Sequence, residues 1–288
     1  MTRIAVLTPD PADKSYIGRW PEVLARLKTT LETTGAEITP TPWTDHVEDA
    51  SGLEGHDLIL PVIAWGYHRD HARWLKACAT WATAGLPIAN PASVLGWNSD
   101  KTYLARLADK GVPIPPTRWS EAITQDQVDA AFAETGAPTL IIKPTVSAGA
   151  FRTLRLTPGK PLTEAPEGPA MIQPYLKSIE TEGETSLLFF GGRFSHAVNK
   201  RPVPGDFRIQ IQFGGLYATV TPDAAAFALA EQVLAAVEEP LLYARIDLAR
   251  DDAGAWVLME AGLIEPDFYL DHDPANGAGF AQAVRNRL

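Results

Sequence analysis

The sequence predicts an α/β protein built from two or three lobes, the first of which is an open, mostly parallel sheet. Three observations support this prediction. The chain of 288 residues is long enough for two or three domains. Strand-like and helix-like segments alternate over roughly the first hundred residues, which is typical of parallel sheets. From Glu184 onward the chain is rich in strand-like segments, which indicates a lobe of different construction.

The composition is that of an ordinary globular chain, and it narrows the range of partners. Hydrophobic residues make up 45% and charged residues 21% of the sequence, which argues against disorder. The net charge of −10 argues against nonspecific binding to nucleic acid or to anionic membranes, so we expect neither partner. The lone Cys78 excludes an internal disulfide. No segment approaches the roughly 20 apolar residues of a membrane span, and the first apolar run is too short for a signal peptide, so we expect a cytoplasmic protein.

The amino-terminal elements follow from short apolar runs and helical spacing. Arg3–Leu7 predicts a buried strand that ends at a Thr-Pro pair. Apolar residues recur at helical spacing over Trp20–Thr33, and Gly35 follows as a helix stop. Leu58–Ile63 predicts a second buried strand, and Arg69–Ala82 a second helix. Ligands of parallel sheets bind beyond the carboxyl ends of the strands, so the loop after the second strand is a candidate site.

That loop has the sequence AWGYHRD. It offers Trp65, Tyr67, His68 and Arg69 as candidate substrate contacts. The alternative is a helix-entry loop with partly buried aromatic side chains. The sequence leaves both interpretations open.

The middle of the chain predicts a helix followed by a small sheet. Ser99 or Asp100 is placed to cap a helix through Lys110. The proline-rich segment VPIPPTRW reads as a surface linker. Further along, we expect a helix at Gln125–Glu134 and strands at Thr139–Lys143, Phe151–Leu156 and Met171–Gln173.

The last third predicts mostly strands. The strand-like segments are ETSLLFF, RFSHAVNK and GDFRIQIQF, of which the first begins at Glu184. A helix is expected at Ala224–Val237 and a closing helix at Pro274–Arg287. Between them lies a predicted hairpin of Tyr243–Arg250 and Trp256–Glu260.

This hairpin carries the most informative pattern. A period of two residues places Arg245 and Asp247 on one face, and Leu258 and Glu260 together on one face. If the turn centres on Ala253 and Gly254, Asp247 lies opposite Glu260, with the two Cβ atoms roughly 4.5–5.5 Å apart. Facing carboxylates repel each other unless a cation lies between them, and Mg²⁺ is the commonest such cation beside phosphates. The alternative is a solvated hairpin with two surface acids.

Basic residues elsewhere favour a polyanionic ligand. Lys143 ends a predicted strand, and the small-residue turn TVSAGA follows it, whose backbone N–H groups could bind an anion. The spacing is not that of a P-loop. Lys101 is a second candidate phosphate contact. A basic cluster follows Gly192, although it could equally be a strand face in water; it consists of Arg193, Lys200, Arg201 and Arg208.

Taken in order along the chain, these features resemble the ATP-grasp superfamily of carboxylate–amine ligases. The resemblance implies an α/β fold with an amino-terminal parallel-sheet domain at residues 1–97 and two lobes, 98–176 and 177–288, that clamp ATP. It implies ATP and Mg²⁺ as cofactors and a small amino-acid-like substrate, with a homodimer as the family precedent. The ATP contacts that it implies are Lys101, Lys143, Ser147, Gly149, Gln173, Pro174, Tyr175, Leu176 and Glu184, with Glu180 and Glu182 as rivals of Glu184.

The resemblance also assigns roles at the reacting end of the site. Asp247 and Glu260 match the metal carboxylates, whereas Gly262 stands where the family usually has a third ligand, so Glu265 is the candidate to compensate. The residues implied in catalysis are Lys143, Arg208 and Arg245, and the candidate substrate contacts are Tyr67, His68 and Lys200.

A narrower resemblance is to the subgroup of O-ureido-D-serine cyclo-ligases, through PVIAWGYH, LGWNSDKTYL, TEGETSLLFFGGRFSHAVNKRP, GDFRIQ and LIEPDFYL. It implies an ADP-forming enzyme of antibiotic biosynthesis that activates a carboxylate as an acyl phosphate and forms an amide, with intramolecular cyclisation as one form of the reaction. The alternative, motivated by Gly262, is a non-catalytic ATP-binding module with a degenerate metal site.

Overall fold

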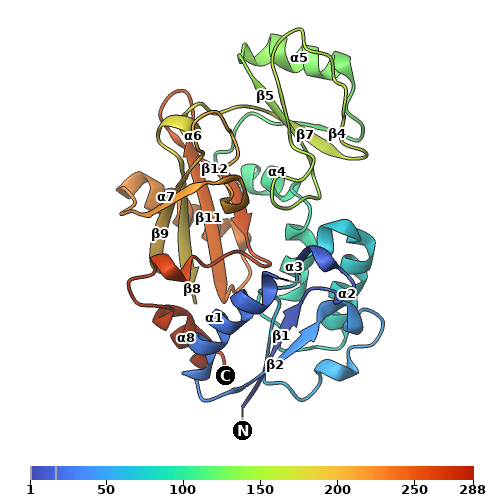
Figure 1. Ribbon diagram of the computed structural model, residues 1–288, viewed down its shortest axis with the longest axis vertical. Helices are drawn as coiled ribbons and strands as arrows, with labels where there is room; N and C mark the ends of the chain where they lie inside the picture. The colour runs from blue at the N-terminus through green and yellow to red at the C-terminus, as the bar shows by residue number, and fades with distance from the viewer. Residues whose placement is uncertain (1, 17) are drawn as a thin grey trace.

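The computed structural model describes residues 2–16 and 18–288 and contains three sheets (Figure 1). Their strands fall within residues 3–60, 118–174 and 184–262. Each sheet therefore lies inside one of the three predicted domains, whose boundaries stay a prediction. No helix in the described part of the chain is long and apolar enough to cross a membrane.

The amino-terminal sheet is parallel, as predicted, with the strand order β2-β1-β3. Its strands are β1 (Arg3–Thr8), β2 (Glu37–Pro42) and β3 (Leu58–Leu60). Alternate residues of β1 serve two cores: Ile4 packs on the side of helix α1 (Trp20–Glu32), and Leu7 on the side of α2 (His71–Thr83). Helices therefore cover both faces of the sheet.

Strand β2 has no counterpart among the predicted elements. Its sequence, EITPTP, contains Pro40 and Pro42, which are poor strand residues because proline cannot donate a backbone hydrogen bond. The strand lies at the edge of the sheet, where one side of its backbone needs no partner strand. The predicted strand Leu58–Ile63 is also shorter than expected, since it ends before Pro61.

The central sheet is antiparallel and has the order β4-β7-β5-β6. Its strands are β4 (Arg118–Ser120), β5 (Leu140–Pro144), β6 (Leu154–Leu156) and β7 (Ala170–Pro174). Helix α5 (Gln125–Thr135) covers it, and this small lobe stands at the top of Figure 1. The side chain of Thr124 caps α5 by accepting a hydrogen bond from the backbone N–H of Gln127.

The predicted helix from Ser99 or Asp100 to Lys110 is shorter than expected. Two short helices occupy this region: α3 (Ala92–Asn98) and α4 (Tyr103–Ala108). Asp100 caps neither helix; its Oδ1 accepts a hydrogen bond from the Thr102 backbone N–H. The linker between the helices carries Lys101, and α4 packs against the core of the carboxy-terminal sheet.

The carboxy-terminal sheet is antiparallel, with the order β10-β9-β8-β11-β12. Its strands are β8 (Glu184–Phe190), β9 (Arg193–Arg201), β10 (Leu216–Thr219), β11 (Tyr243–Arg250) and β12 (Trp256–Gly262). The remaining α-helices are α6 (Ser178–Thr181), α7 (Ala224–Val237) and α8 (Ala278–Arg285). The 3-10 helices are Lys14–Tyr16, Trp43–His46, Ser51–Leu53, Tyr67–Arg69, Ile211–Phe213 and Leu270–His272.

The predicted strand GDFRIQIQF is wrong, because this segment is a loop with one 3-10 turn. The loop folds back on itself after Phe213. A Cβ atom at Gly215 would lie 1.9 Å from the carbonyl oxygen of Ile209, so only glycine allows this close approach. The alternation of apolar and polar residues therefore does not reflect a strand here.

Candidate active site

A cavity of about 700 Å³ is lined by residues of all three predicted domains. The amino-terminal lobe contributes the loop of Tyr67 and His68, the central lobe contributes Lys143, and the carboxy-terminal sheet contributes Asp247 and Glu260. The described structure thus brings to one cavity the residues that the sequence indicated on segments far apart in the chain.

The hairpin of β11 and β12 places its two acids as predicted, but through a β-bulge. Asp247 pairs with Glu260, whereas the next pair along is Leu248 with Leu258, so Met259 is an extra residue in β12. The turn alone would set Asp247 opposite Met259. The bulge also puts Leu258 into the core and Glu260 into the cavity, so the prediction that these two side chains share a face is wrong.

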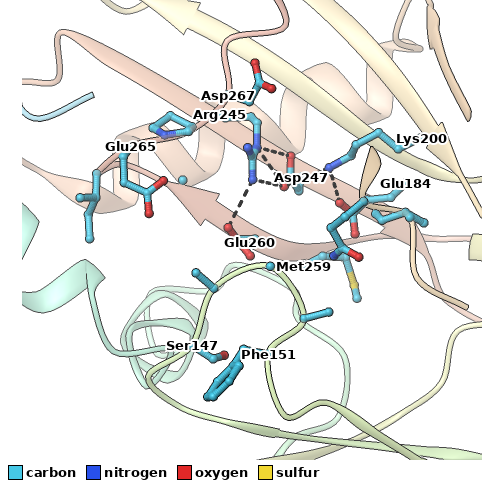
Figure 2. Close-up of a pocket in the computed structure, with 18 of the residues that line it drawn as sticks. Ser147, Phe151, Glu184, Lys200, Arg245, Asp247, Met259, Glu260, Glu265 and Asp267 are labelled. Carbon is cyan, nitrogen blue, oxygen red and sulfur yellow. Dashed lines mark hydrogen bonds and ion pairs between the residues drawn. The ribbon is translucent and has the colours of Figure 1, made fainter. Parts of the chain in front are cut away.

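Charged side chains of alternating sign form a continuous row along the cavity floor, part of which Figure 2 shows. Lys200 donates to Glu184 at 2.6 Å and lies 3.3 Å from Asp247. Arg245 bridges the two hairpin acids, at 3.0 Å from Asp247 and 3.3 Å from Glu260. The row ends at Lys101, whose Nζ lies 3.5 Å from Glu260.

The row stabilises the charges of Glu260 and Lys200, whereas burial raises the pKa of Glu184 despite the neighbouring Lys200. Lys101 and Arg245 outweigh the effect of burial and lower the pKa of Glu260 to about 2. Burial opposes the charge of Lys200, yet Asp247 and Glu184 together raise its pKa above the usual value. The predicted substrate contact Lys200 is thus held by two acids in the row, and its contact with substrate stays a prediction.

Lys143 lines this cavity without an ion-pair partner among the described residues. It lies at the end of β5, and among the described residues no hydrogen bond or ion pair engages its ammonium group. Burial, followed by the nearby charge of Lys101, lowers its pKa to about 8. A half-buried ammonium group without an acid beside it raises the positive potential of the cavity and favours an anionic ligand.

Two hydrogen bonds join the segment that carries Lys101 to the segment that follows Lys143. The backbone N–H of Lys101 donates to the carbonyl of Thr145 at 2.8 Å, and Thr145 donates to Asp100 at 3.2 Å. The following loop, with Ser147 and Gly149, also lines the cavity, and Gly149 has a left-handed φ of +60°. Figure 2 shows Ser147 on the far side of the cavity from the acids.

The predicted adenine segment borders another part of the cavity. Gln173, Pro174, Tyr175 and Leu176 line it at the end of β7. Three apolar side chains lie beside them, namely Ile141, Ile209 and Met259. The arrangement offers an apolar slot of the kind that suits a planar base.

The three acids that are candidates for binding ribose differ in whether they line the cavity. Glu184 lines the cavity at the end of β8. Glu180 instead pairs with Arg155 at 3.2 Å, and Glu182 pairs with Arg250 at 3.4 Å; neither lines the cavity. Glu184 is therefore the acid that can reach a bound nucleotide in this structure.

The amino-terminal end of the cavity is aromatic, and its titratable groups include His68 and Glu265. Burial, helped by Arg69 and Lys101, lowers the pKa of His68 to about 4, and its Nδ1 atom has no hydrogen-bond partner among the described residues. Burial raises the pKa of Glu265 to about 8. Tyr67 is mostly buried and stacks on Trp74 at a ring separation of 5.1 Å, so its ring also serves the core.

The other predicted arginines are partly engaged elsewhere. Asp13 holds the guanidinium of Arg69 at 2.8 Å. Arg208 lines the cavity from the loop after β9, where Asp206 binds it at 2.8 Å. The ring of Phe213 lies 3.8 Å from its guanidinium carbon.

Sequence reasoning missed several cavity residues. These are Tyr16, Arg19, Phe151, Met259 and Tyr269; Ser186, which was also missed, supports the cavity from behind by donating to Asp247. Tyr269 lies within the stretch LIEPDFYL that carries the resemblance, whereas the others belong to no recognisable motif.

Comparison with solved structures defines the class of fold. The D-alanine–D-alanine ligase from Bacillus anthracis superposes with a TM-score of 0.71 over 100% of this chain and 99% of that chain, at 16% identity. The ATP-grasp ligase PsnB superposes with a TM-score of 0.68 over 99% of this chain and 98% of that chain, at 17% identity. The chain therefore has the ATP-grasp fold, which confirms the predicted fold class.

A narrower similarity is to proteins of cycloserine synthesis. The crystal structure of the D-cycloserine synthetase DcsG superposes with a TM-score of 0.81 over 99% of both chains, at 24% identity. The cycloserine biosynthesis protein DcsG of Streptomyces lavendulae is 28% identical over 275 residues, covering 89% of this chain and 90% of that protein. The predicted resemblance is thereby confirmed. No protein-family model matches the chain.

Proposed function

We propose that this protein is an ATP-dependent, ADP-forming ligase. It activates the carboxylate of a small amino-acid-like molecule as an acyl phosphate and joins it to an amine, in the same molecule or in another. The observation that carries the proposal is Lys143, a half-buried ammonium group without a partner among the described residues, beside Lys101 in a cavity floored by Asp247 and Glu260. The similarity to a cycloserine biosynthesis protein supports a substrate of the amino-acid class.

ATP has one natural orientation in this cavity. The apolar slot of Leu176 and Met259 suits the adenine ring, and Glu184 is placed for the ribose hydroxyls. The triphosphate then lies toward Lys101 and Lys143, whose positive charges neutralise it. Related structures hold ATP in a D-alanine–D-alanine ligase and Mg with ADP in PsnB.

The exposed carboxylate of Glu260 suits a divalent cation beside the phosphates. Asp247 and Glu260 are paired across the hairpin, and the side chain of Glu260 is 42% exposed toward the cavity. Among the described residues no group of three His, Cys, Asp or Glu side chains is placed to hold a metal, and Glu265 lies apart from the pair in Figure 2. Mg²⁺ bound there would neutralise phosphate charge and align the triphosphate. We therefore place Glu265 on the substrate side.

The chemistry requires charge neutralisation and alignment more than covalent help from the protein. A carboxylate oxygen of the substrate forms a bond to the γ-phosphorus while the bond to ADP breaks. The amine then attacks the acyl carbon, phosphate leaves, and the amine loses a proton. Lys143 and Arg245 face the charge that develops on phosphorus, and Arg208 approaches from its loop.

Water must stay out while the acyl phosphate exists, since hydrolysis would waste it. The loop of residues 145–150 lies over the phosphate end of the cavity, and Phe151 follows it, with 51% of the residue exposed. The ring of Phe151 lies 6.1 Å from that of His68 in the amino-terminal lobe. This contact links the loop of the central lobe to the amino-terminal lobe across the cavity.

The test is a screen for ADP release at fixed ATP and Mg²⁺, with O-ureido-D-serine and small amino acids of both configurations as substrates. Hydroxylamine is added in parallel, because only an acyl phosphate yields a hydroxamate. Wild type is expected to release ADP and form a hydroxamate with at least one acid. Lys143→Ala abolishes both, whereas Lys28→Ala, on an exposed helix face, leaves both unchanged. ATP binding without ADP release for any acid supports the non-catalytic module instead.

Two further proposals concern the setting of the protein. We propose a homodimer and a cytoplasmic location, as the resemblance and the composition indicate. Light scattering after size-exclusion chromatography tests the first, and fractionation of the native host tests the second.

A further inference from the structure

The guanidinium of Arg245 lies between the two hairpin acids. Its Nε donates to both oxygens of Asp247 at 3.1 Å, and its Nη2 donates to Glu260 at 3.3 Å (Figure 2). The side chain is 13% exposed. A positive charge supplied by the protein thus occupies the space between the carboxylates, where a cation that bridged them would have to bind.

Gly262 provides the room for this arrangement. It pairs directly with Arg245 across the hairpin. A Cβ atom at this position would lie 3.1 Å from Cβ of Pro266 and 3.7 Å from the guanidinium carbon of Arg245. The backbone of Gly262 does not have a left-handed φ, so the conformation alone does not demand glycine. Any larger side chain would compete with the guanidinium for the same space.

The oxygens of Asp247 are already fully engaged. Ser186 donates to Oδ1 at 2.6 Å, and Lys200 lies 3.3 Å from Oδ2, in addition to the bonds from Arg245. The side chain of Asp247 is 2% exposed, against 42% for Glu260. Glu260 is therefore the acid that is accessible from the cavity. The oxygens of Asp247 are occupied by hydrogen bonds and are not available to bridge two metal ions.

Resting on the proposed function, we propose that Arg245 takes the place of a second divalent cation, and that the nucleotide site binds one such cation rather than two. The single cation binds at the exposed side of Glu260 and completes its shell with phosphate oxygens and water. A second dication between the acids would face the positive charges of Arg245 and Lys200 at close range, which disfavours it.

The count of bound metal ions tests this proposal. Mn²⁺ replaces Mg²⁺, and loss of the signal of free Mn²⁺ in electron paramagnetic resonance measures binding to protein saturated with the non-hydrolysable analogue AMPPNP. The loss of free Mn²⁺ signal measured with protein alone, without nucleotide, is subtracted to remove binding outside the nucleotide site. Wild type is expected to bind one Mn²⁺ per chain. Arg245→Gln, which removes the charge, is expected to bind two, and the matched variant Arg245→Lys one.

Two Mn²⁺ ions per wild-type chain would overturn the proposal, and so would one ion per chain in Arg245→Gln. If Arg245→Gln does not fold, Arg245→Met is measured, which also removes the charge but keeps a long side chain; a count of two is expected, and a count of one contradicts the proposal. Failure of wild type to bind AMPPNP at all would instead refute the proposed function, because the metal count presupposes a nucleotide site.

Discussion

Lys143 makes the affinity for nucleotide depend on pH in a defined way. Its pKa is about 8 in the free protein, since burial and Lys101 disfavour its charge. A bound triphosphate stabilises the charged form and raises that pKa, so nucleotide binds best where Lys143 is already protonated. Affinity is therefore full below pH 8 and falls as the pH rises through 8.

The magnitude follows from the titration of one group. Between pH 7 and pH 9 the protonated fraction of a group with a pKa of about 8 falls from about nine-tenths to about one-tenth. The dissociation constant for AMPPNP with Mg²⁺ is thus expected to rise about tenfold over this range, as measured by isothermal titration calorimetry.

Two variants distinguish the contribution of Lys143 to this pH dependence from that of neighbouring titratable groups. Lys143→Arg keeps a positive charge at both pH values, so its dissociation constant is expected to change much less. Glu265, with a pKa of about 8, titrates over the same range. Glu265→Gln is expected to keep most of the pH dependence. An unchanged dissociation constant in wild type, or an equal rise in Lys143→Arg, would refute the reasoning.

Three further predictions concern the acids and the loop. Asp247→Asn removes the acid that Arg245 and Lys200 share and leaves each cation with one acid, so substrate-dependent ADP release is lost and thermal denaturation shifts to lower temperature, by the equivalent of about 3 kcal/mol; wild-type stability would contradict this. Phe151→Ala opens the cavity to water, so the ratio of hydroxamate to ADP falls several-fold while ADP release continues, whereas Leu75→Ala, at an exposed site on α2, leaves the ratio unchanged. The raised pKa of Glu265 means that the folded protein binds a proton that the unfolded chain releases above its ordinary pKa of 4.5, so stability falls as the pH rises from 4.5 to 8. Glu265→Gln is accordingly expected to raise the melting temperature at pH 9 and to change it little at pH 4, and equal shifts at both pH values would count against a buried carboxyl.

The elements with strong periodicity could be predicted from the sequence. Helix α7 has the predicted bounds, Ala224–Val237, because its apolar residues repeat without interruption and Asp223 caps it. Strand β2 could not be predicted, since its prolines are tolerated only through its position at the sheet edge, which is a property of the tertiary structure. The loop GDFRIQIQF has strand-like alternation, but the close approach that Gly215 permits folds it back.

In the candidate site, too, some features could be predicted from the sequence and others depend on the tertiary structure. The pairing of Asp247 with Glu260 was predicted from the distance of each to the turn, yet it depends on a bulge at Met259 that the sequence does not signal. The row of alternating charges could not be foreseen either, because Lys200 and Lys101 reach it from separate segments. The sequence indicates which side chains carry charge, whereas their partners depend on how the lobes pack.

Transfer of an oxygen atom tests the ligase mechanism most directly. The acid most active in the screen is labelled with ¹⁸O in its carboxylate, and the phosphate released with ADP is examined by ³¹P nuclear magnetic resonance. Formation of an acyl phosphate predicts that one ¹⁸O atom moves from the carboxylate to each phosphate. Unlabelled phosphate, released in step with amide formation, would contradict the account.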